Sequence, residues 1–244
     1  WRTEISALFG LIEYTEKGKC KQSRLAENLY RRQDLIEFFR FFAYKFQYPG
    51  GHLKPSSTLK MINNGVRFKP AKYLLELLFK ATESKGRFGL SKAEATHCIF
   101  NDLRVIRGYK NVEEVIDLID TNRKKNIEYD SMGDVIRYAG DILDYLVLAD
   151  ILDLRPNGKY YLKSYELEVV NSIINSNEYF TGYDNLYGKV KLSLADVKKT
   201  QVSWYEYVNE GINAKIFKGD ISNLIISKEV ESDFDPVNNF LQDI

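Results

Sequence analysis

The densest run of apolar residues in the chain lies over positions 34–49, where the sequence reads DLIEFFRFFAYKFQYP. Phe38, Phe42 and Phe46 recur at every fourth position. Such spacing is typical of an amphipathic helix, here with a very wide apolar face. Gln47, Tyr48 and Pro49 end it, because proline lacks an amide hydrogen and disfavours a helical conformation in the residue before it. We expect this helix to be buried and to join a module that ends before it to one that begins after it.

The residues before this helix predict a helix followed by a hairpin. An apolar pattern over residues 2–9 favours a helix, and Gly10 suits the left-handed cap that ends one. Alternating residues over 11–14 and 19–23 predict two short strands, and another helix is expected over 24–30. Helix, two-stranded wing and helix is the closing order of a winged-helix unit. We therefore expect the first helices of that unit to lie upstream.

The same order is expected a second time further along the chain. A polar stretch over residues 50–64 predicts an exposed loop. Ser91 and Glu94 have the spacing of a capping box, which marks the start of a short helix. The elements expected after the loop are helices over 68–81, 92–100, 112–120 and 130–151, strands over 152–155 and 159–162, and a closing helix over 165–174. Residues 175–187 are interpreted as a linker and 193–211 as a helix.

Together these elements predict a mainly α-helical chain with small β wings, arranged as tandem winged-helix (helix-turn-helix) modules. The expected division has four parts. They are the C-terminal part of a first winged-helix module over 1–33, a connecting aromatic helix and loop over 34–66, a second winged-helix module with a helical insertion over 67–176, and a helical linker toward a separate catalytic domain over 177–244.

The composition is that of an ordered globular protein. Of 244 residues, 44% are hydrophobic and 14% aromatic, which is enough to build a core. No run reaches the length of a transmembrane helix and none has the pattern of a secretory signal, so no membrane partner is expected. The two cysteines and two histidines lack zinc-ligand spacing, and so few cysteines indicate a reducing, cytoplasmic compartment.

A net charge of +1 hides a strong asymmetry along the chain. Residues 1–126 hold 24 Lys and Arg against 14 Asp and Glu, a net charge of +10. Residues 127–244 hold 11 against 20, a net charge of −9. Such asymmetry favours a polyanion-binding region paired with an acidic one, and the alternative is chance clustering of solvated charges.

An ordered set of short matches resembles the AlwI-like type IIS restriction endonucleases and their nicking relatives. The matching stretches are Gly10 to Tyr14, Leu25 to Leu29, Phe46-Gln47-Tyr48-Pro49, Phe68-Lys69-Pro70, Leu74 to Leu78, Gly89-Leu90-Ser91-Lys92, Ala149 to Leu162 and Ile173-Ile174. They cover most of residues 1–176. The architecture is also similar to the FokI-like stacking of winged-helix units. The resemblance implies the DNA-recognition region of a restriction endonuclease, with double-stranded DNA as its partner.

In that family a separate PD-(D/E)XK domain cuts DNA with Mg²⁺, so the resemblance implies a nuclease domain or subunit as a second partner. We expect no catalytic residues, metal or cofactor in this part of the chain, which we expect to be monomeric. Asp184 with Asp196 and Lys198 is a formal match to the nuclease motif. Yet the residues around Asp196 also predict the start of a helix, whereas the motif requires strands.

Residues expected to contact DNA fall in three groups. The helix before a wing usually enters the major groove with its N-terminal residues, and the wing and flanking basic residues contact phosphates. The residues so predicted are Arg2, Thr3 and Ser6 for bases, Lys17, Lys19, Lys21 and Arg24 in the first wing, and Arg104, Arg107, Lys110, Arg123, Lys124 and Lys125 in the insertion. For Arg2 the alternative is a disordered end of a truncated chain. For the first wing it is an ordinary solvated hairpin, and for the insertion it is solvated helix flanks.

In the second module the corresponding helix is not expected to bind DNA, because its acidic residues would repel phosphates. They are Asp130, Asp134, Asp141 and Asp144, against only Arg137. We expect this helix to pack on another domain.

Two other functional classes stay open. A non-enzymatic winged-helix transcription regulator would bind a palindromic site as a dimer, and a helical protein-interaction module would bind no DNA.

Overall fold

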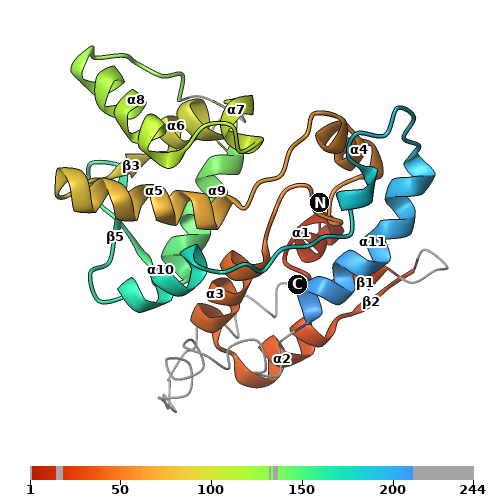
Figure 1. The fold of residues 1–244 in the computed structure, drawn as a ribbon. Coiled ribbons are helices and arrows are strands. Elements are labelled where there is room, and N and C mark those ends of the chain that lie inside the picture. The colour runs from red at the N-terminus through yellow and green to blue at the C-terminus, as the bar shows by residue number, and fades with distance from the viewer. Residues whose placement is uncertain (1, 15–18, 132, 134–136, 211–244) are drawn as a thin grey trace.

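The computed structural model describes residues 2–14, 19–131, 133 and 137–210 (Figure 1). Helices dominate, and two small antiparallel sheets accompany them. The prediction of a mainly α-helical chain with small β elements is therefore confirmed.

The described chain forms two lobes on either side of a connecting helix, α3 (Leu35–Lys45). The first lobe contains α1 (Arg2–Leu8), β1 (Ile12–Tyr14), β2 (Cys20–Gln22), α2 (Arg24–Arg32), α4 (Pro55–Asn63), the 3-10 turn Asp184–Leu186 and α11 (Leu194–Asn209). The second lobe contains α5 (Pro70–Lys85), β3 (Leu90–Ser91), α6 (Lys92–Ala95) continued by the π-helical Thr96–Phe100, α7 (Leu103–Ile106), α8 (Val112–Lys124), α9 (Arg137–Leu148), β4 (Leu152–Leu154), β5 (Lys159–Leu162) and α10 (Leu167–Ile174).

Helix α3 is the predicted aromatic helix, and it ends earlier than expected. Asp34 caps its N-terminus by accepting a hydrogen bond from the Glu37 amide at 2.9 Å. Phe46 is already extended, and Tyr48 pairs with Phe68 in an isolated antiparallel bridge. The helix stops at Lys45 because the backbone beyond it makes its hydrogen bonds to the segment that leads into α5.

An aromatic cluster links α3 to both lobes. Phe9, just after α1, has its ring 5.2 Å from that of Phe42, 5.6 Å from that of Phe39 and 5.0 Å from that of Tyr145 on α9. All three contacts are edge-to-face, a geometry that aromatic quadrupoles favour. The main core is continuous from α2 through α3 into the second lobe. The helix thus packs against both lobes, and the predicted division of the chain into modules stays a prediction.

The sheet of the second lobe has three strands in the order β3-β5-β4, all antiparallel. The hairpin of β4 and β5 was predicted, with Leu152 opposite Leu162. Strand β3 was not, because only Leu90 and Ser91 belong to it and pairing with Tyr160 and Lys159 defines it. The capping box that begins α6 directly after this strand is confirmed.

Residues 50–64 were predicted as an exposed polar loop, and this prediction is wrong. Residues 55–63 form α4, with Pro55 in its first turn. Thr58 and Ile62, four residues apart, are buried on the face that packs against α11. The apolar signal was too short to show a helix before its partner, nearly 140 positions away in the sequence, was known.

The predicted helix over 130–151 begins later than expected within the described chain. Residues 130 and 131 are not helical, and α9 is described from Arg137. The carbonyl of Asp130 instead accepts a hydrogen bond from the ring of His97 at 2.8 Å. At the other end, Asp150 has a φ of 60°, which turns the chain into β4.

The stretch over 175–187 was interpreted as a linker, but it packs against the first lobe. Gln47 holds it by donating to the Phe180 carbonyl at 3.2 Å and accepting from the Phe180 amide at 2.8 Å. Phe180, Tyr183 and Leu186 are buried with Trp204 in a second core cluster. The segment therefore anchors α11, and residues 211–244 lie outside the described part.

We predict that replacing Phe42 by alanine lowers the free energy of unfolding by about 3–5 kcal/mol, because the cavity would lie where three elements meet. Ile36 on the same helix is 45% exposed. Ile36→Ala, the matched control, should cost about 1 kcal/mol or less. Urea unfolding followed by circular dichroism measures both. Equal losses would contradict the packing of α3 described above.

Candidate nucleic-acid interface

The first group of predicted DNA contacts lies at the beginning of α1. Arg2 and Thr3 are its first residues, and their side chains lie outside the description. Ser6 is half-buried one turn later. Gly10, with a φ of +69°, ends the segment and turns it directly into β1, so α1 and the following hairpin form one unit.

The first hairpin is basic, but not all of its charge is available. Lys21 forms an ion pair at 3.0 Å with Glu13, its neighbour across the two strands. Lys17 lies outside the described residues, and Lys19 is exposed. Arg24, exposed at the start of α2, forms no ion pair with a described residue.

The basic residues around α7 are held by internal contacts. Asp102 binds the guanidinium of Arg104 at 2.7 Å and the ammonium of Lys110 at 3.4 Å. The hydrogen bonds from Arg104 hold the pKa of Asp102 well below its usual range. Arg107 donates to the carbonyl of Asn64 and so ties this turn to α4. Arg104 is the one of these three whose side chain is mainly exposed.

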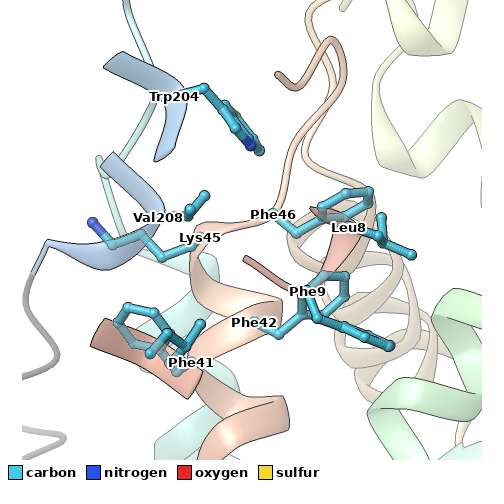
Figure 2. A pocket seen from close by; sticks show the side chains of 9 residues that line it. Leu8, Phe9, Phe41, Phe42, Lys45, Phe46, Trp204 and Val208 are labelled. Carbon is cyan, nitrogen blue, oxygen red and sulfur yellow. The ribbon is translucent and has the colours of Figure 1, made fainter. Parts of the chain in front are cut away.

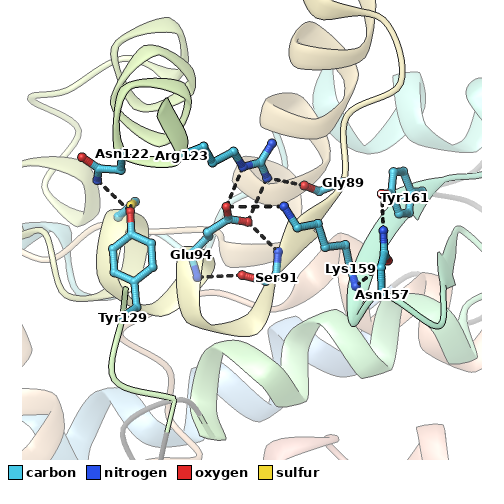
Figure 3. A network of polar contacts seen from close by, with 10 residues as sticks. Gly89, Ser91, Glu94, Asn122, Arg123, Tyr129, Asn157, Lys159 and Tyr161 are labelled. Carbon is cyan, nitrogen blue, oxygen red and sulfur yellow. Dashed lines mark hydrogen bonds and ion pairs between the residues drawn. The ribbon is translucent and has the colours of Figure 1, made fainter. Parts of the chain in front are cut away.

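Arg123, at the end of α8, is part of a partly buried polar network (Figure 3). It donates two hydrogen bonds to Glu94, at 2.6 and 2.9 Å, and another to the Gly89 carbonyl. Burial raises the pKa of Glu94, but the bonds from Arg123 and the Ser91 amide outweigh it, so that the pKa lies below its ordinary value. Lys159 adds a charge at 3.8 Å. Arg123 therefore fastens the insertion to β3 and α6.

Its neighbours differ from it. Lys124 pairs with Asp120 at 3.3 Å on the helix surface. Lys125 is exposed and forms no ion pair within the described chain. The three consecutive basic residues thus have three different environments, which the sequence alone does not distinguish.

The acidic face expected on α9 is partly neutralised. Asp144 accepts a hydrogen bond from Lys92 at 2.6 Å and another from the Tyr160 hydroxyl at 2.5 Å. Asp141 lies 4.0 Å from Arg137, and burial raises its pKa. Asp134 lies outside the described residues. The repulsion of phosphates expected from this helix is therefore weaker than the number of its carboxylates indicates.

The structure also shows a group that sequence analysis missed. Arg87, Arg155 and Tyr161 come from three separate positions and meet at the second hairpin. No local pattern joins them, because the pairing of β3 with β5 brings Arg87 to the hairpin.

Two other features of the molecule are not sites. The cavity lined by Leu8, Phe46, Trp204 and their neighbours has a volume of about 10 Å³, roughly the room for one water molecule. Figure 2 shows aromatic and aliphatic side chains around it, with the Lys45 ammonium directed away from Trp204. We interpret the cavity as a packing defect.

The formal nuclease match does not fit a metal site. Asp196 caps α11 with Ser193, so Asp196 and Lys198 lie on a helix and not on a strand. Asp184 pairs with Arg67 at 3.3 Å. Among the described residues, no group of three or more His, Cys, Asp or Glu side chains could hold a metal ion.

Comparison with known proteins identifies the family. A family model described as restriction endonuclease BpuJI, N-terminal, matches residues 1–205. The chain belongs to this family. The resemblance to restriction endonucleases is confirmed at this level, and the narrower resemblance to AlwI-like enzymes stays a prediction. No curated protein matches the chain.

A solved structure has the same fold as this chain. It is the BpuJ1 endonuclease binding domain in complex with pyrene- and phenanthrene-modified DNA. The TM-score is 0.71 and the identity 24%, over 85% of this chain and 76% of that chain.

Within the described residues, no helix is both long and apolar enough to cross a membrane.

We predict that Arg123→Ala destabilises the protein by about 2–4 kcal/mol at pH 7, because it leaves Glu94 buried without its main partner. In the wild type the lowered pKa of Glu94 contributes stability above the pKa of the unfolded carboxyl, and this stability is lost as the pH falls. In the variant only the Ser91 amide and Lys159 still oppose the effect of burial, so the pKa of Glu94 is higher than in the wild type and acid relieves the buried charge.

The difference between the two proteins should therefore shrink from pH 7 to pH 4. Lys125→Ala, which removes the same charge two residues away, should change stability by about 0.5 kcal/mol or less. Urea titrations at both pH values measure these differences. A cost of Arg123→Ala that does not change with pH would contradict the role assigned to Glu94.

Proposed function

We propose that this chain recognises a specific sequence in double-stranded DNA, as the target-recognition region of a type IIS restriction endonuclease. The observation that carries the proposal is the membership of residues 1–205 in the BpuJI N-terminal family. The fold shared with a binding domain solved on DNA supports it. Neither alternative class, a transcription regulator or a protein-interaction module, has a comparable observation in its favour.

The topology of the second lobe supports a winged-helix interpretation. Helix α5 is followed by strand β3, helix α6, an inserted pair of helices, helix α9 and the β4–β5 hairpin. Strand β3 pairs with β5, which places the first strand beside the last. Helix, strand, helix, helix and two-stranded wing is the order of a winged-helix module. In the proposal α9 is its recognition helix. This replaces the expectation that its acidic residues keep it out of a groove, because Asp144 is paired with Lys92 and Tyr160.

The first lobe supports a second module of the same kind. Its described part begins with α1 and continues through the β1–β2 hairpin into α2. In the proposal α1 is a recognition helix whose first residues face base edges in the major groove. Lys19, Lys21 and Arg24 then contact phosphates on either side of that groove.

Cleavage belongs, in this proposal, to a separate PD-(D/E)XK domain that uses Mg²⁺. The helical setting of Asp196 and Lys198 agrees with that division. The proposal further treats the recognition region as a monomer on an asymmetric site. That state distinguishes it from a dimeric regulator.

The deciding experiment is selection of bound duplexes from a randomised pool, followed by sequencing. We expect an asymmetric motif of about four to six base pairs and binding that weakens steeply with salt. A palindromic motif with a dimeric complex would favour the regulator. Absence of binding at low salt would overturn DNA recognition and favour a protein partner.

We predict that Arg2→Ala relaxes the selected sequence at one position, because arginine to guanine is the commonest base contact. Arg24→Ala, a phosphate contact in the proposal that forms no ion pair with a described residue, should weaken binding to all duplexes equally and reduce the salt slope by about 1. Repeating the selection with both variants measures the difference. Unchanged motifs for both would remove Arg2 from the proposed base contacts.

A further inference from the structure

Two arginines from different parts of the chain converge on one tyrosine ring in the second lobe. Arg87 lies between α5 and β3, and its guanidinium carbon is 5.4 Å from the centroid of the Tyr161 ring. Arg155 follows β4, and its guanidinium carbon is 4.5 Å from the same centroid. Tyr161 itself is on β5, so three chain segments build the group.

The tyrosine ring is held in place by its surroundings. A side-chain carbon added at Gly89 would come within 2.3 Å of the Tyr161 ring, so the ring lies directly against the Gly89 backbone. The Asn157 amide donates a hydrogen bond to the Tyr161 hydroxyl at 2.8 Å, which fixes the other end of the side chain (Figure 3). A fixed ring limits the positions of both guanidinium groups before any partner arrives.

Neither guanidinium has a carboxylate partner among the described residues. Arg40 and Arg104, by contrast, each lie within 3 Å of a carboxylate oxygen. Asp153 is opposite Tyr161 in the hairpin, but it pairs with Lys163 at 3.6 Å. Two positive charges therefore share one ring without a counter-ion from the described chain.

We propose that Arg87 and Arg155, positioned by Tyr161, form a clamp for the phosphodiester backbone of duplex DNA. The proposal rests on the proposed function and adds a contact surface to it. A guanidinium presents several N–H donors in one plane, which match phosphate oxygens in a bidentate arrangement. Stacking on the ring uses the face of that plane and leaves the N–H edge for the phosphate.

The position in the fold agrees with a backbone contact. Arg155 lies in the turn of the hairpin that directly follows α9, the recognition helix of the second module in the proposed function. A wing in that position flanks the groove that its helix enters, where phosphates lie. Contacts of this kind position the protein and add affinity without reading sequence.

The test measures binding of the intact chain to its selected duplex and to a scrambled one over a series of NaCl concentrations, by fluorescence anisotropy. The variant is Arg87→Ala/Arg155→Ala. We expect about 10-fold weaker binding to both duplexes at 150 mM salt, and a salt slope reduced by about 1.8 for two lost phosphate contacts. Its selected motif should not change.

Matched variants separate a clamp from general charge. Lys60→Ala/Lys198→Ala removes two exposed lysines from α4 and α11 and should leave the slope within about 0.3 of wild type. Arg87→Lys/Arg155→Lys keeps the charge but loses the planar fork, and should recover less than half of the lost affinity. Tyr161→Leu should weaken binding more than Tyr161→Phe, which keeps the ring and loses only the hydrogen bond from Asn157. Urea midpoints verify that every variant is folded.

The outcomes distinguish this inference from the proposed function. If the wild type binds no duplex, the proposed function fails and the clamp fails with it. If the wild type binds and the double arginine variant has the same affinity and slope, only the clamp is overturned. Equal losses of affinity for Arg87→Ala/Arg155→Ala and for Lys60→Ala/Lys198→Ala would also overturn it, because net charge alone would then explain the effect.

Discussion

The arrangement of the two lobes depends on the packing of one helix, α3. Its aromatic side chains are buried on more than one side, so the helix cannot move relative to either lobe without exposing them. Phe9 from the first lobe and Tyr145 from the second meet on this helix, with their rings 5.0 Å apart. Burial of an aromatic ring contributes several kcal/mol, and interdigitated rings tolerate little sliding. For a protein with two proposed DNA-contacting lobes, this packing sets the separation between them.

Polar contacts at the C-terminal end of α3 add a second constraint. Lys45, at the end of the helix, pairs with Glu178, and Gln47 binds the backbone of Phe180 in both directions. Lys69 donates to the carbonyls of Tyr44 and Glu178, and burial lowers its pKa to about 7. These groups are satisfied only when residues 176–180 lie beside α3 and α5. The return of the chain toward α11 is therefore specified by hydrogen bonds as well as by apolar burial.

The features that sequence analysis predicted correctly are those with local causes. The periodicity of α3, the Ser91–Glu94 capping box and the β4–β5 hairpin each depend on residues a few positions apart. Helix α4 and strand β3 were missed because each is defined by a distant partner, α11 in one case and β5 in the other. The same holds for the candidate site. A run of basic residues such as 123–125 shows charge, but only the fold shows that Glu94 occupies the first of them.

The charge asymmetry of the chain is smaller once the ion pairs of the fold are counted. Part of it is cancelled within the described chain, because four acidic residues of the second half pair with basic residues of the first. The pairs are Arg40–Glu166, Lys45–Glu178, Arg67–Asp184 and Lys92–Asp144. A net charge counted along the sequence therefore overstates the field that an approaching polyanion meets.

What matters for binding is the subset of cations that folding leaves without a carboxylate. Arg87 and Arg155 belong to this subset, and an aromatic ring holds them where a carboxylate would otherwise be needed. In the proposed clamp no described acid competes for them, so a phosphate there would be attracted by both at little cost in side-chain entropy.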